Sequence, residues 1–426
     1  MRRVVPEAGK AFLGDWGETL VLVKTMRVGT PGFIPERLTE VRAARRLTSM
    51  SALARRLSMS ASTVARWEEG SSAPDADAMT ALTTALQVRR EFFLRPIFDP
   101  PRAKFYRSLS STLVRDIDYQ HSQLRWQQEI SSILQHYVDL PAIDVPDVLG
   151  KTGYKQLRDE DIERIALDLR RHWKIGEGPC TDVVPLLERV GMVVGTIEMG
   201  TSKLDGVCSW SAAEDRPHIL LATDKMSFPR RQMDAAHEMA HAVLHKNVSK
   251  DELKRDLKQI EKQAFRLASA FLLPSTTYPY EVKRASLAML LTLKEKWRVS
   301  IKAQIKRLSD LELIPEGHNI DLYKLYSAKG WNREEPLDHQ WQISEPRSLA
   351  NAMNLIADSG LRTKADLLAV EFTMSAGDVE NLTSLPPGWF SSRAADVVQL
   401  KQDVTRTAFP SQGAGVVVPF GRFNDR

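Results

Sequence analysis

Three histidines and one glutamate stand close together in the segment 236-AHEMAHAVLH-245, which is otherwise apolar. If the segment is helical, His237 and His241 project from one face roughly 6 Å apart, a spacing that suits two ligands of one tetrahedral zinc ion. Glu238 then lies about 100° around the helix, where a general base can take a proton from water at the metal. The spacing predicts a hydrolytic zinc site, with plain helix packing as the alternative.

A catalytic zinc ion usually takes three protein ligands, so a third ligand must be found. His245 shares the helix face but lies about 12 Å along the helix from His237, too far for one ion, and we interpret it as a supporting or packing residue. Glu261 is the better candidate, because it lies at the edge of the apolar face of the next predicted helix, 251–273. Taken alone, a glutamate on such a helix is more often a solvated charge.

The surrounding elements predict a mostly helical α+β fold class. Apolar, β-branched runs at 191–199 and 217–222 predict two strands before the histidine segment. We interpret 217–222 as a sheet edge along which an extended substrate peptide would lie, with an interior strand as the alternative. Arg230 and Arg231 could meet an acidic substrate, but we interpret them as solvated loop charges.

A second motif lies near the N-terminus, in 53-LARRLSMSASTVARWEEG-70. It fits a scaffold helix, a tight turn and a second helix that enters the DNA major groove. Predicted helices at 36–45, 50–57, 60–69 and 76–86 surround it. Residues 33–96 contain ten Arg and no Lys against seven Asp plus Glu, which suits phosphate contact. A helical bundle used only for protein contacts is the alternative. The candidate DNA contacts are Ser60, Ala61, Ser62, Thr63 and Arg66, with Ser60 also the helix N-cap.

Length and composition set the broad class. The chain has 426 residues, 43% of them hydrophobic, and a net charge of +5, so about two or three domains can each bury a core. Cys180 and Cys208 share no short spacing, which argues against a disulfide framework and favours a reducing compartment. No apolar run reaches the length of a secretory signal or membrane span, which predicts a cytoplasmic protein with no membrane partner.

Several further features have structural interpretations. Trp297, Trp331 and Trp341 are predicted aromatic anchors of a core, with a ligand pocket as the alternative. The segment 297–314 has helix-turn-helix spacing and basic residues, and we interpret it as a structural part of the second domain. A helical pair at 359–382 is assigned to packing or partner binding.

From Leu47 through Trp67 to 92-FFLRP-96, the N-terminal segment resembles the DNA-binding domain of the Xre (Cro/phage-repressor) regulators, most specifically in "S-x-x-T-[IV]-x-x-W-E-x-G". The resemblance implies double-stranded DNA as a partner, and a homodimer is compatible with half-site geometry. Ala61 departs from the family, in which Arg or Gln commonly reads a base here. Specificity would then rest on Ser62, Thr63, Arg66 and DNA shape.

The pattern "A-H-E-x-x-H-A-x-L-H" followed by "E-x-x-A-x-x-x-A-x-x-x-L-L-P" resembles the ImmA/IrrE family of zinc metallopeptidases over most of residues 105–390. Members of that family cleave Xre-type repressors. The resemblance implies a Zn²⁺ cofactor, with His237, His241 and Glu261 as ligands and Glu238 as the catalytic base. Phe265 departs from the Asn that is frequent in the second motif, which puts one contact around the ligands in doubt.

The sequence therefore predicts an N-terminal extension (1–32), an all-α helix-turn-helix domain (33–97), a helical linker region (98–178), a zincin-like peptidase domain with a small β-sheet (179–315), and a helical C-terminal region and tail (316–426). The predicted function is a DNA-binding regulator whose zinc endopeptidase cleaves itself, a partner Xre-type repressor or a toxin–antitoxin protein. The alternative is a non-proteolytic transcription factor or antitoxin whose zinc-site domain senses a ligand or partner.

Overall fold

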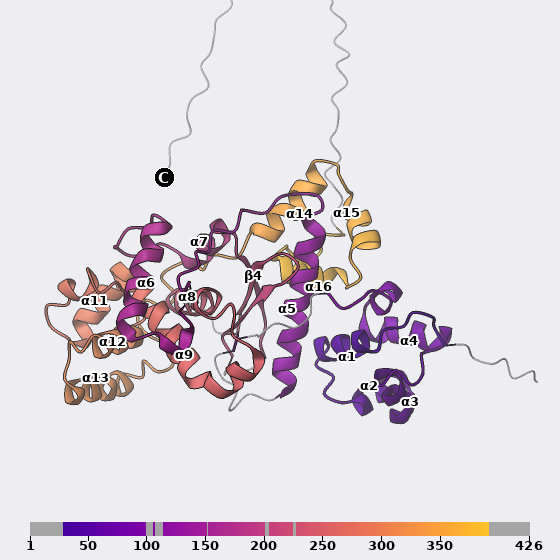
Figure 1. Cartoon of the computed structure of the whole chain (residues 1–426), viewed down its shortest axis with the longest axis horizontal. Helices are drawn as coiled ribbons and strands as arrows, with labels where there is room; N and C mark the ends of the chain where they lie inside the picture. The colour runs from indigo at the N-terminus through magenta and orange to yellow at the C-terminus, as the bar shows by residue number, and fades with distance from the viewer. Residues whose placement is uncertain are drawn as a thin grey trace, which may run out of the picture. The chain divides into compact units, whose positions relative to one another are not determined.

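The fold is taken from a computed structural model of the chain, which describes residues 29–98, 105–106, 114–150, 152–200, 204–224 and 227–391. These residues form a mostly helical α+β structure around a small sheet, which confirms the predicted fold class (Figure 1). Most of the predicted N-terminal extension, and the tail beyond residue 391, lie outside the described residues. None of the described helices is long and apolar enough to cross a membrane.

The sheet has the strand order β1-β3-β4-β2. β2 pairs with β4 in parallel, whereas β3 runs antiparallel to both β4 and β1. The sequence predicts β2 and β4 but not the other two strands, since β3 reads GVCSWS without apolar alternation and β1 has only two residues. The strands are β1 (Phe105–Tyr106), β2 (Val193–Ile197), β3 (Gly206–Ser211) and β4 (Arg216–Ala222).

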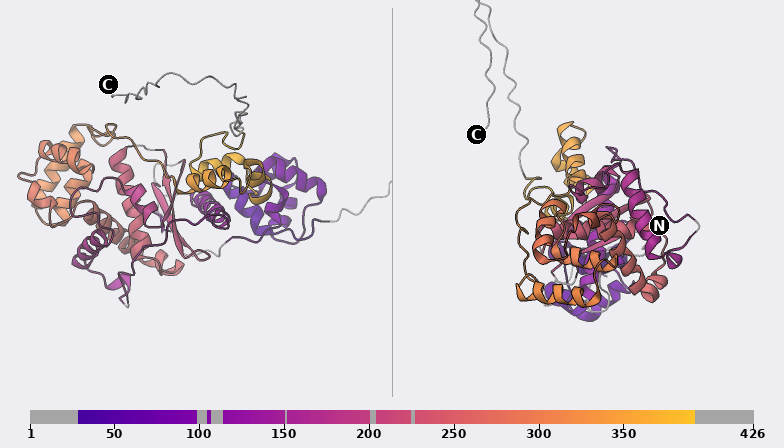
Figure 2. Two further views of the ribbon diagram at one scale, coloured as in Figure 1. Left: turned by 90° about the horizontal axis from the view of Figure 1, so that it is seen from above. Right: turned by 90° about the vertical axis from the view of Figure 1, so that its left-hand side faces the viewer.

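Successive residues of these strands point into two different cores. Val194 and Ile219 belong to the core that contains the histidine helix, whereas their neighbours Val193 and Leu220 belong to the core that contains the N-terminal helices. This is the two-residue period of a strand with both faces covered. The sheet therefore forms a middle layer between two layers of helices (Figure 2).

The first helical layer holds the histidine helix α8 and its neighbour α9. The N-cap Ser249 and Glu252 form a reciprocal capping box at the start of α9, and Pro274 follows its end. The helices of this layer are α6 (Asp159–His172), α7 (Val183–Arg189), α8 (Phe228–Leu244), α9 (Lys250–Leu272), α10 (Tyr278–Glu281), α11 (Leu287–Trp297), α12 (Ile301–Asp310) and α13 (Glu316–Ala328).

The second helical layer holds the N-terminal helices, one long helix and the C-terminal helices. The predicted helical linker region contributes the long helix α5, which covers the sheet. The helices of this layer are α1 (Pro35–Ala44), α2 (Met50–Leu57), α3 (Ala61–Glu68), α4 (Ala76–Leu86), η1 (Arg90–Phe93), α5 (Val114–Leu134), α14 (Ser348–Asp358), α15 (Lys364–Asp366), η3 (Leu367–Glu371) and α16 (Ala376–Thr383). A short turn of helix, η2 (Tyr154–Gln156), precedes α6.

Ion pairs and a strand-like bridge tie the N-terminal helices to the rest of this layer. Arg45, which follows α1, donates two hydrogen bonds of 2.6 Å to the carboxylate of Asp378 in α16. Val88 and Met374 form an isolated antiparallel bridge. The segment 359–382 thus packs on the helix-turn-helix region, which confirms the packing interpretation of that segment.

The tryptophans and the segment 297–314 have the packing roles that were predicted for them. Trp297 is buried in the first core, and Trp331 packs against it. Trp341 lies against the ring of Phe228 at a centroid distance of 6.1 Å. Helix α12, from the predicted basic segment 297–314, buries its apolar face in the same core. Both cysteines are free and buried, in agreement with the absence of a disulfide framework.

Glu163 of α6 joins three helices of the first layer. Arg307 of α12 donates to its two carboxylate oxygens at 2.6 and 2.7 Å, and Arg266 of α9 donates at 2.7 Å. Burial opposes ionisation of Glu163, but the two guanidinium groups outweigh burial and hold the pKa of its carboxyl below its usual value. Because the pKa is lower in the folded state, these ion pairs stabilise the fold above the usual carboxyl range and are lost as the pH falls through the folded pKa.

We expect Glu163→Gln to lower the free energy of unfolding at neutral pH by about 2 kcal/mol, less than for a fully buried pair because Glu163 is partly exposed. The difference from wild type should shrink toward zero as the pH falls through the lowered pKa of Glu163, because the wild-type carboxyl is then protonated too. Urea unfolding of the metal-free protein at a series of pH values measures it. Lys262→Gln, on the exposed side of α9, serves as a control that changes little, and a difference independent of pH would contradict this account.

Candidate metal centre and nucleic-acid interface

The side chains of His237, His241 and Glu261 converge between α8 and α9. Their ligand atoms all lie within 4.8 Å of one another. The two Nε2 atoms are 3.0 Å apart, and the carboxylate oxygens of Glu261 lie 3.5 Å from His237 Nε2 and 3.3 Å from His241 Nε2. Both histidines are buried. The structure thus brings together the three predicted ligands.

These separations fit a zinc ion. Ligand atoms about 2.0–2.2 Å from a tetrahedral ion lie about 3.3–3.6 Å apart, and the separations here, 3.0, 3.3 and 3.5 Å, are close to these values. Burial opposes ionisation of Glu261, but the hydrogen bonds and charges of His237 and His241 lower the pKa of its carboxyl to about 2. An ionised carboxylate facing two imidazole nitrogens in a buried space is a donor set that suits a divalent cation.

His245 lies behind His241 and outside this cluster. Its Nδ1 lies 3.1 Å from Nδ1 of His241, and its Nε2 lies 3.2 Å from Oε1 of Gln263. Burial lowers the pKa of the His245 imidazole to about 3, so the ring is neutral. Gln263 in turn donates to the carbonyl of Tyr154 at 2.6 Å. These successive contacts can fix the ring of His241 with Nε2 directed at the metal position. Its geometry agrees with the predicted supporting role of His245.

Glu238 is buried against the first residue of β3. A Cβ atom added at Gly206 would lie 2.6 Å from Oε1 and 2.8 Å from Cγ of Glu238, so only glycine leaves room for the glutamate here. The sequence analysis missed Gly206. A glycine inside or at the start of a strand often marks a place where another group approaches the backbone closely. Gly206 could have been found from this signal, but the strand that it begins was not predicted.

The predicted substrate edge is wrong. β4, which contains the segment 217–222, is an interior strand bonded to β3 on one side and to β2 on the other. The strand that lies next to Glu238 is β3, and β1 pairs with it at only two positions. The edge nearest the candidate centre is therefore that of β3.

The expectation for Arg230 and Arg231 is also wrong. Both belong to α8, which begins earlier than the predicted loop allows. Arg230 is ion-paired with Asp205, and Arg231 is buried and donates to the carbonyl of Ala222. Phe265 packs on His237 with ring centroids 4.2 Å apart, at the position where the family frequently has Asn.

Helix α3 presents the predicted DNA contacts at the surface. The Ser60 side chain caps the helix by accepting from Thr63 N at 3.1 Å, and its Oγ also lies within 2.9 Å of the Ser62 hydroxyl. Ser60, Ala61, Ser62 and Arg66 are exposed and Thr63 is half-buried. Val64 and Trp67 face the core instead, as the motif requires.

Ion pairs hold α3 on its scaffold. Arg42 of α1 forms a two-point pair with Glu68 of α3, at 2.6 and 3.0 Å, and also donates to the carbonyl of Leu47. Arg55 and Arg56 at the end of α2 are exposed beside it. The sequence analysis did not single out these two arginines.

Comparisons with known families agree with this geometry. Residues 38–93 match a helix-turn-helix family model, and residues 187–309 match the model of the IrrE N-terminal-like domain, which contains the whole candidate centre. The chain therefore joins an Xre-type helix-turn-helix domain to an ImmA/IrrE-family peptidase domain, as the resemblance predicted. A search of curated proteins finds no match.

We expect Gly206→Ala to displace the Glu238 side chain, because the added methyl group would overlap it. Peptide cleavage should fall about a hundred-fold, the typical loss when a general base is misplaced, while zinc content stays the same. Gly317→Ala is the matched control, since nothing lies within 4 Å of its Cβ position. Elemental analysis and a cleavage assay measure both variants; equal cleavage by the Gly206 variant and wild type would contradict the close contact.

We expect Arg66→Ala to weaken binding to the promoter DNA of this chain's own gene about ten-fold, because Arg66 is exposed on the helix that is predicted to enter the major groove. Fluorescence anisotropy at fixed ionic strength measures the affinity. Arg164→Ala removes the same charge from α6, in the other helical layer, and should bind like wild type. Equal losses for the two variants would point to net charge and not to α3.

Proposed function

We propose that this chain is a DNA-binding transcriptional regulator whose second domain is a zinc-dependent endopeptidase. The observation that carries the proposal is the convergence of His237, His241 and Glu261, with Glu238 one residue along the same helix and buried beside them. A site that only held a metal for structural reasons would have no need of a buried carboxylate next to its ligands. This favours the enzyme over a domain that only senses a ligand.

The residues divide the work as follows. His237, His241 and Glu261 would hold the zinc ion, which when bound supplies a Lewis acid that polarises the scissile carbonyl and lowers the pKa of water. Glu238 takes the proton from the attacking water and delivers it to the leaving amine. The contact with Gly206 limits the positions that the carboxylate of Glu238 can adopt.

The edge of β3 is the proposed binding place for the peptide. An extended peptide can add to it as a further strand, with backbone hydrogen bonds holding the scissile bond near Glu238. The chain's own β1 already pairs with this edge, with Phe105 opposite Cys208 and Tyr106 opposite Val207. Two substrates follow: the connection between the two domains of this chain, and a partner Xre-type repressor that takes the place of β1.

The exposed first turn of α3 is proposed to enter the major groove. Ser62, Thr63 and Arg66 would contact bases, and Arg55 and Arg56 would contact phosphates. The Ser60 hydroxyl is committed to its capping bond, so its contribution would be to hold the helix start in place.

The test compares wild type with Glu238→Gln, in which the base is replaced by a group of the same shape that cannot take a proton. Each full-length protein is loaded with zinc and incubated alone and with an Xre-type repressor from the same genome. We expect wild type to produce fragments, and the variant to produce them about a hundred- to ten-thousand-fold more slowly. Mass spectrometry locates the cut in either chain.

Zinc analysis of both proteins supplies the control, because His237 and His241 are unchanged and the metal content should be equal. A metal chelator should abolish cleavage by wild type. If the variant cleaves as fast as wild type, or if wild type cuts neither chain, the peptidase proposal fails. The sensing alternative would then be favoured if DNA binding still depended on added zinc.

A further inference from the structure

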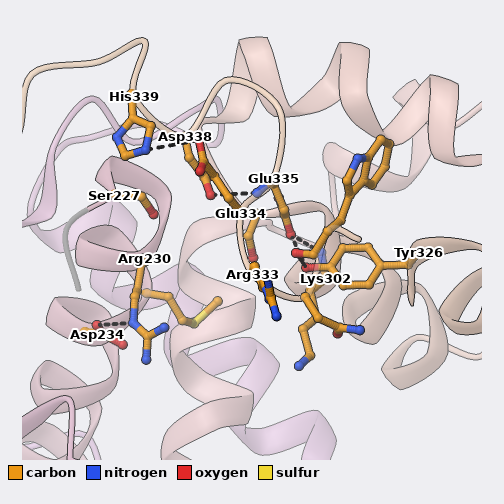
Figure 3. Close-up of a pocket in the computed structure, with 14 residues that line it drawn as sticks. Ser227, Arg230, Asp234, Lys302, Tyr326, Arg333, Glu334, Glu335, Asp338 and His339 are labelled. Carbon is orange, nitrogen blue, oxygen red and sulfur yellow. Dashed lines mark hydrogen bonds and ion pairs between the residues drawn. The ribbon is translucent and has the colours of Figure 1, made fainter. Parts of the chain in front are cut away.

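A pocket of about 450 Å³ opens beside the start of α8. Arg230 and Asp234 line it from α8, whereas Lys302 at the start of α12 and Arg333 after α13 line it from the opposite side (Figure 3). In the view of Figure 3, Lys302 and Arg333 lie on one side of the pocket and Arg230 lies on the other. The function proposed above gives these two cations no role.

The pocket lies along the same helix, α8, as the candidate metal centre. Since α8 rises about 1.5 Å per residue, Asp234 and Arg230 lie about 4.5 and 10.5 Å before His237 along the helix axis. Spacings of three, four and seven residues place them on the same helix face as His237 and His241. A peptide that lies over the metal centre and extends toward the start of α8 must reach this pocket.

The wall that carries Arg333 is firmly held. Lys294, which is fully buried, donates to Glu335 at 2.8 Å and to Asp338 at 2.6 Å. The carboxylate of Glu335 also accepts the backbone N–H of Ile301 at 2.7 Å, so it caps α12. The segment around Arg333 is therefore fixed against the helix that carries Lys302.

The cations that line the pocket differ in whether a carboxylate neutralises them. Arg230 is neutralised by Asp205 and by Asp234, which lies 3.7 Å from it. In contrast, no described carboxylate lies within ion-pair distance of the side chains of Lys302 or Arg333. Both residues are exposed. Two neighbouring cations without an internal counterion create a local attraction for an anionic group.

The sheet indicates which end of a peptide would arrive there. β1 runs antiparallel to β3, with Tyr106 opposite Val207. A peptide bound to β3 in this direction passes Gly206 and then Asp205, whose carboxylate binds Arg230. The part of the peptide that reaches the pocket is therefore its C-terminal part.

We propose that Lys302 and Arg333 bind the carboxylate of an acidic residue of the substrate, about one to three positions C-terminal to the cleaved bond, given about 3.3 Å per extended residue. This inference rests on the proposed peptidase function. A nucleic acid fits less well than a single carboxylate, because the exposed Glu334 next to Arg333 also lines the pocket and would repel a long polyanion. The two cations would thus select among peptide substrates.

The experiment uses the full-length, zinc-loaded Glu238→Gln protein, which holds a peptide without cutting it. Two fluorescein-labelled peptides of Ala and Leu carry either paired Glu or paired Gln in the C-terminal half. We expect the Glu peptide to bind about five-fold tighter at low ionic strength, the size expected for exposed ion pairs. Adding Lys302→Gln and Arg333→Gln should remove this preference, and Lys302→Glu with Arg333→Glu should reverse it.

The matched control is Lys283→Glu with Arg284→Glu in the same background, which changes net charge equally at two exposed residues outside the pocket. It should keep the preference for the Glu peptide. Equal or undetectable binding of the two peptides overturns the inference. The inference is also overturned if a short single-stranded oligonucleotide binds in a way that depends on Lys302 and Arg333 while binding of the peptides does not depend on them. Cleavage of the same peptides by wild type reports on the peptidase function separately, so a failure of either proposal can be told from a failure of the other.

Discussion

The meeting of two imidazole nitrogens and one carboxylate between α8 and α9 is the constraint on which the rest of the structure depends. These three groups lie within 3.5 Å of one another, so the surrounding helices must bury them and hold them in fixed orientations. The close approach of the two helices is possible because alanines occupy their contact, among them Ala236 and Ala240 in α8 and Ala264 and Ala268 in α9, all fully buried. The contacts of His245 with His241 and Gln263 then orient the ring of His241, since a ring held at one nitrogen presents the other nitrogen in a fixed direction.

The sheet connects this centre to the DNA-binding region. β2 and β4 supply alternate residues to two cores, one shared with α8 and the other shared with the N-terminal helices and α5. The N-terminal helices pack on α5, which in turn packs on β3 and β4, so they are joined to the sheet through that helix. Arg45 and Asp378 add a two-point ion pair to this contact, and charge-assisted hydrogen bonds of this kind are directional. Moving the N-terminal helices away would expose the apolar surface that they share with α5, the helix that covers the sheet.

Much of this could be predicted where a single helix carries the signal. The spacing of His237 and His241 fixes their common face, and the helices predicted at 50–57 and 76–86 have those bounds as α2 and α4, because helix periodicity and end signals are local. Sheet order could not be predicted in this way. β3 lacks an apolar pattern, so its place between β4 and β1 depends on packing partners far away in the chain, and the wrong strand was taken as the edge. The two pocket cations, Lys302 and Arg333, were not predicted for the same reason. One is at the start of a helix and the other is in a distant loop, which Glu335 holds against that helix.

The packing also bears on which of the two substrates would link cleavage to gene control. A cut in the connection near β1 would break the backbone between the DNA-binding helices and α5, but it would leave their shared core and the pair between Arg45 and Asp378 in place. The helix-turn-helix region would then stay attached without a covalent bond, as cut proteins with large apolar interfaces do. A partner repressor has no such second attachment to this chain, and a cut within it would separate its parts directly. Under the proposed peptidase function, the shared core makes cleavage of a partner, and not of this chain, the step that would change gene control.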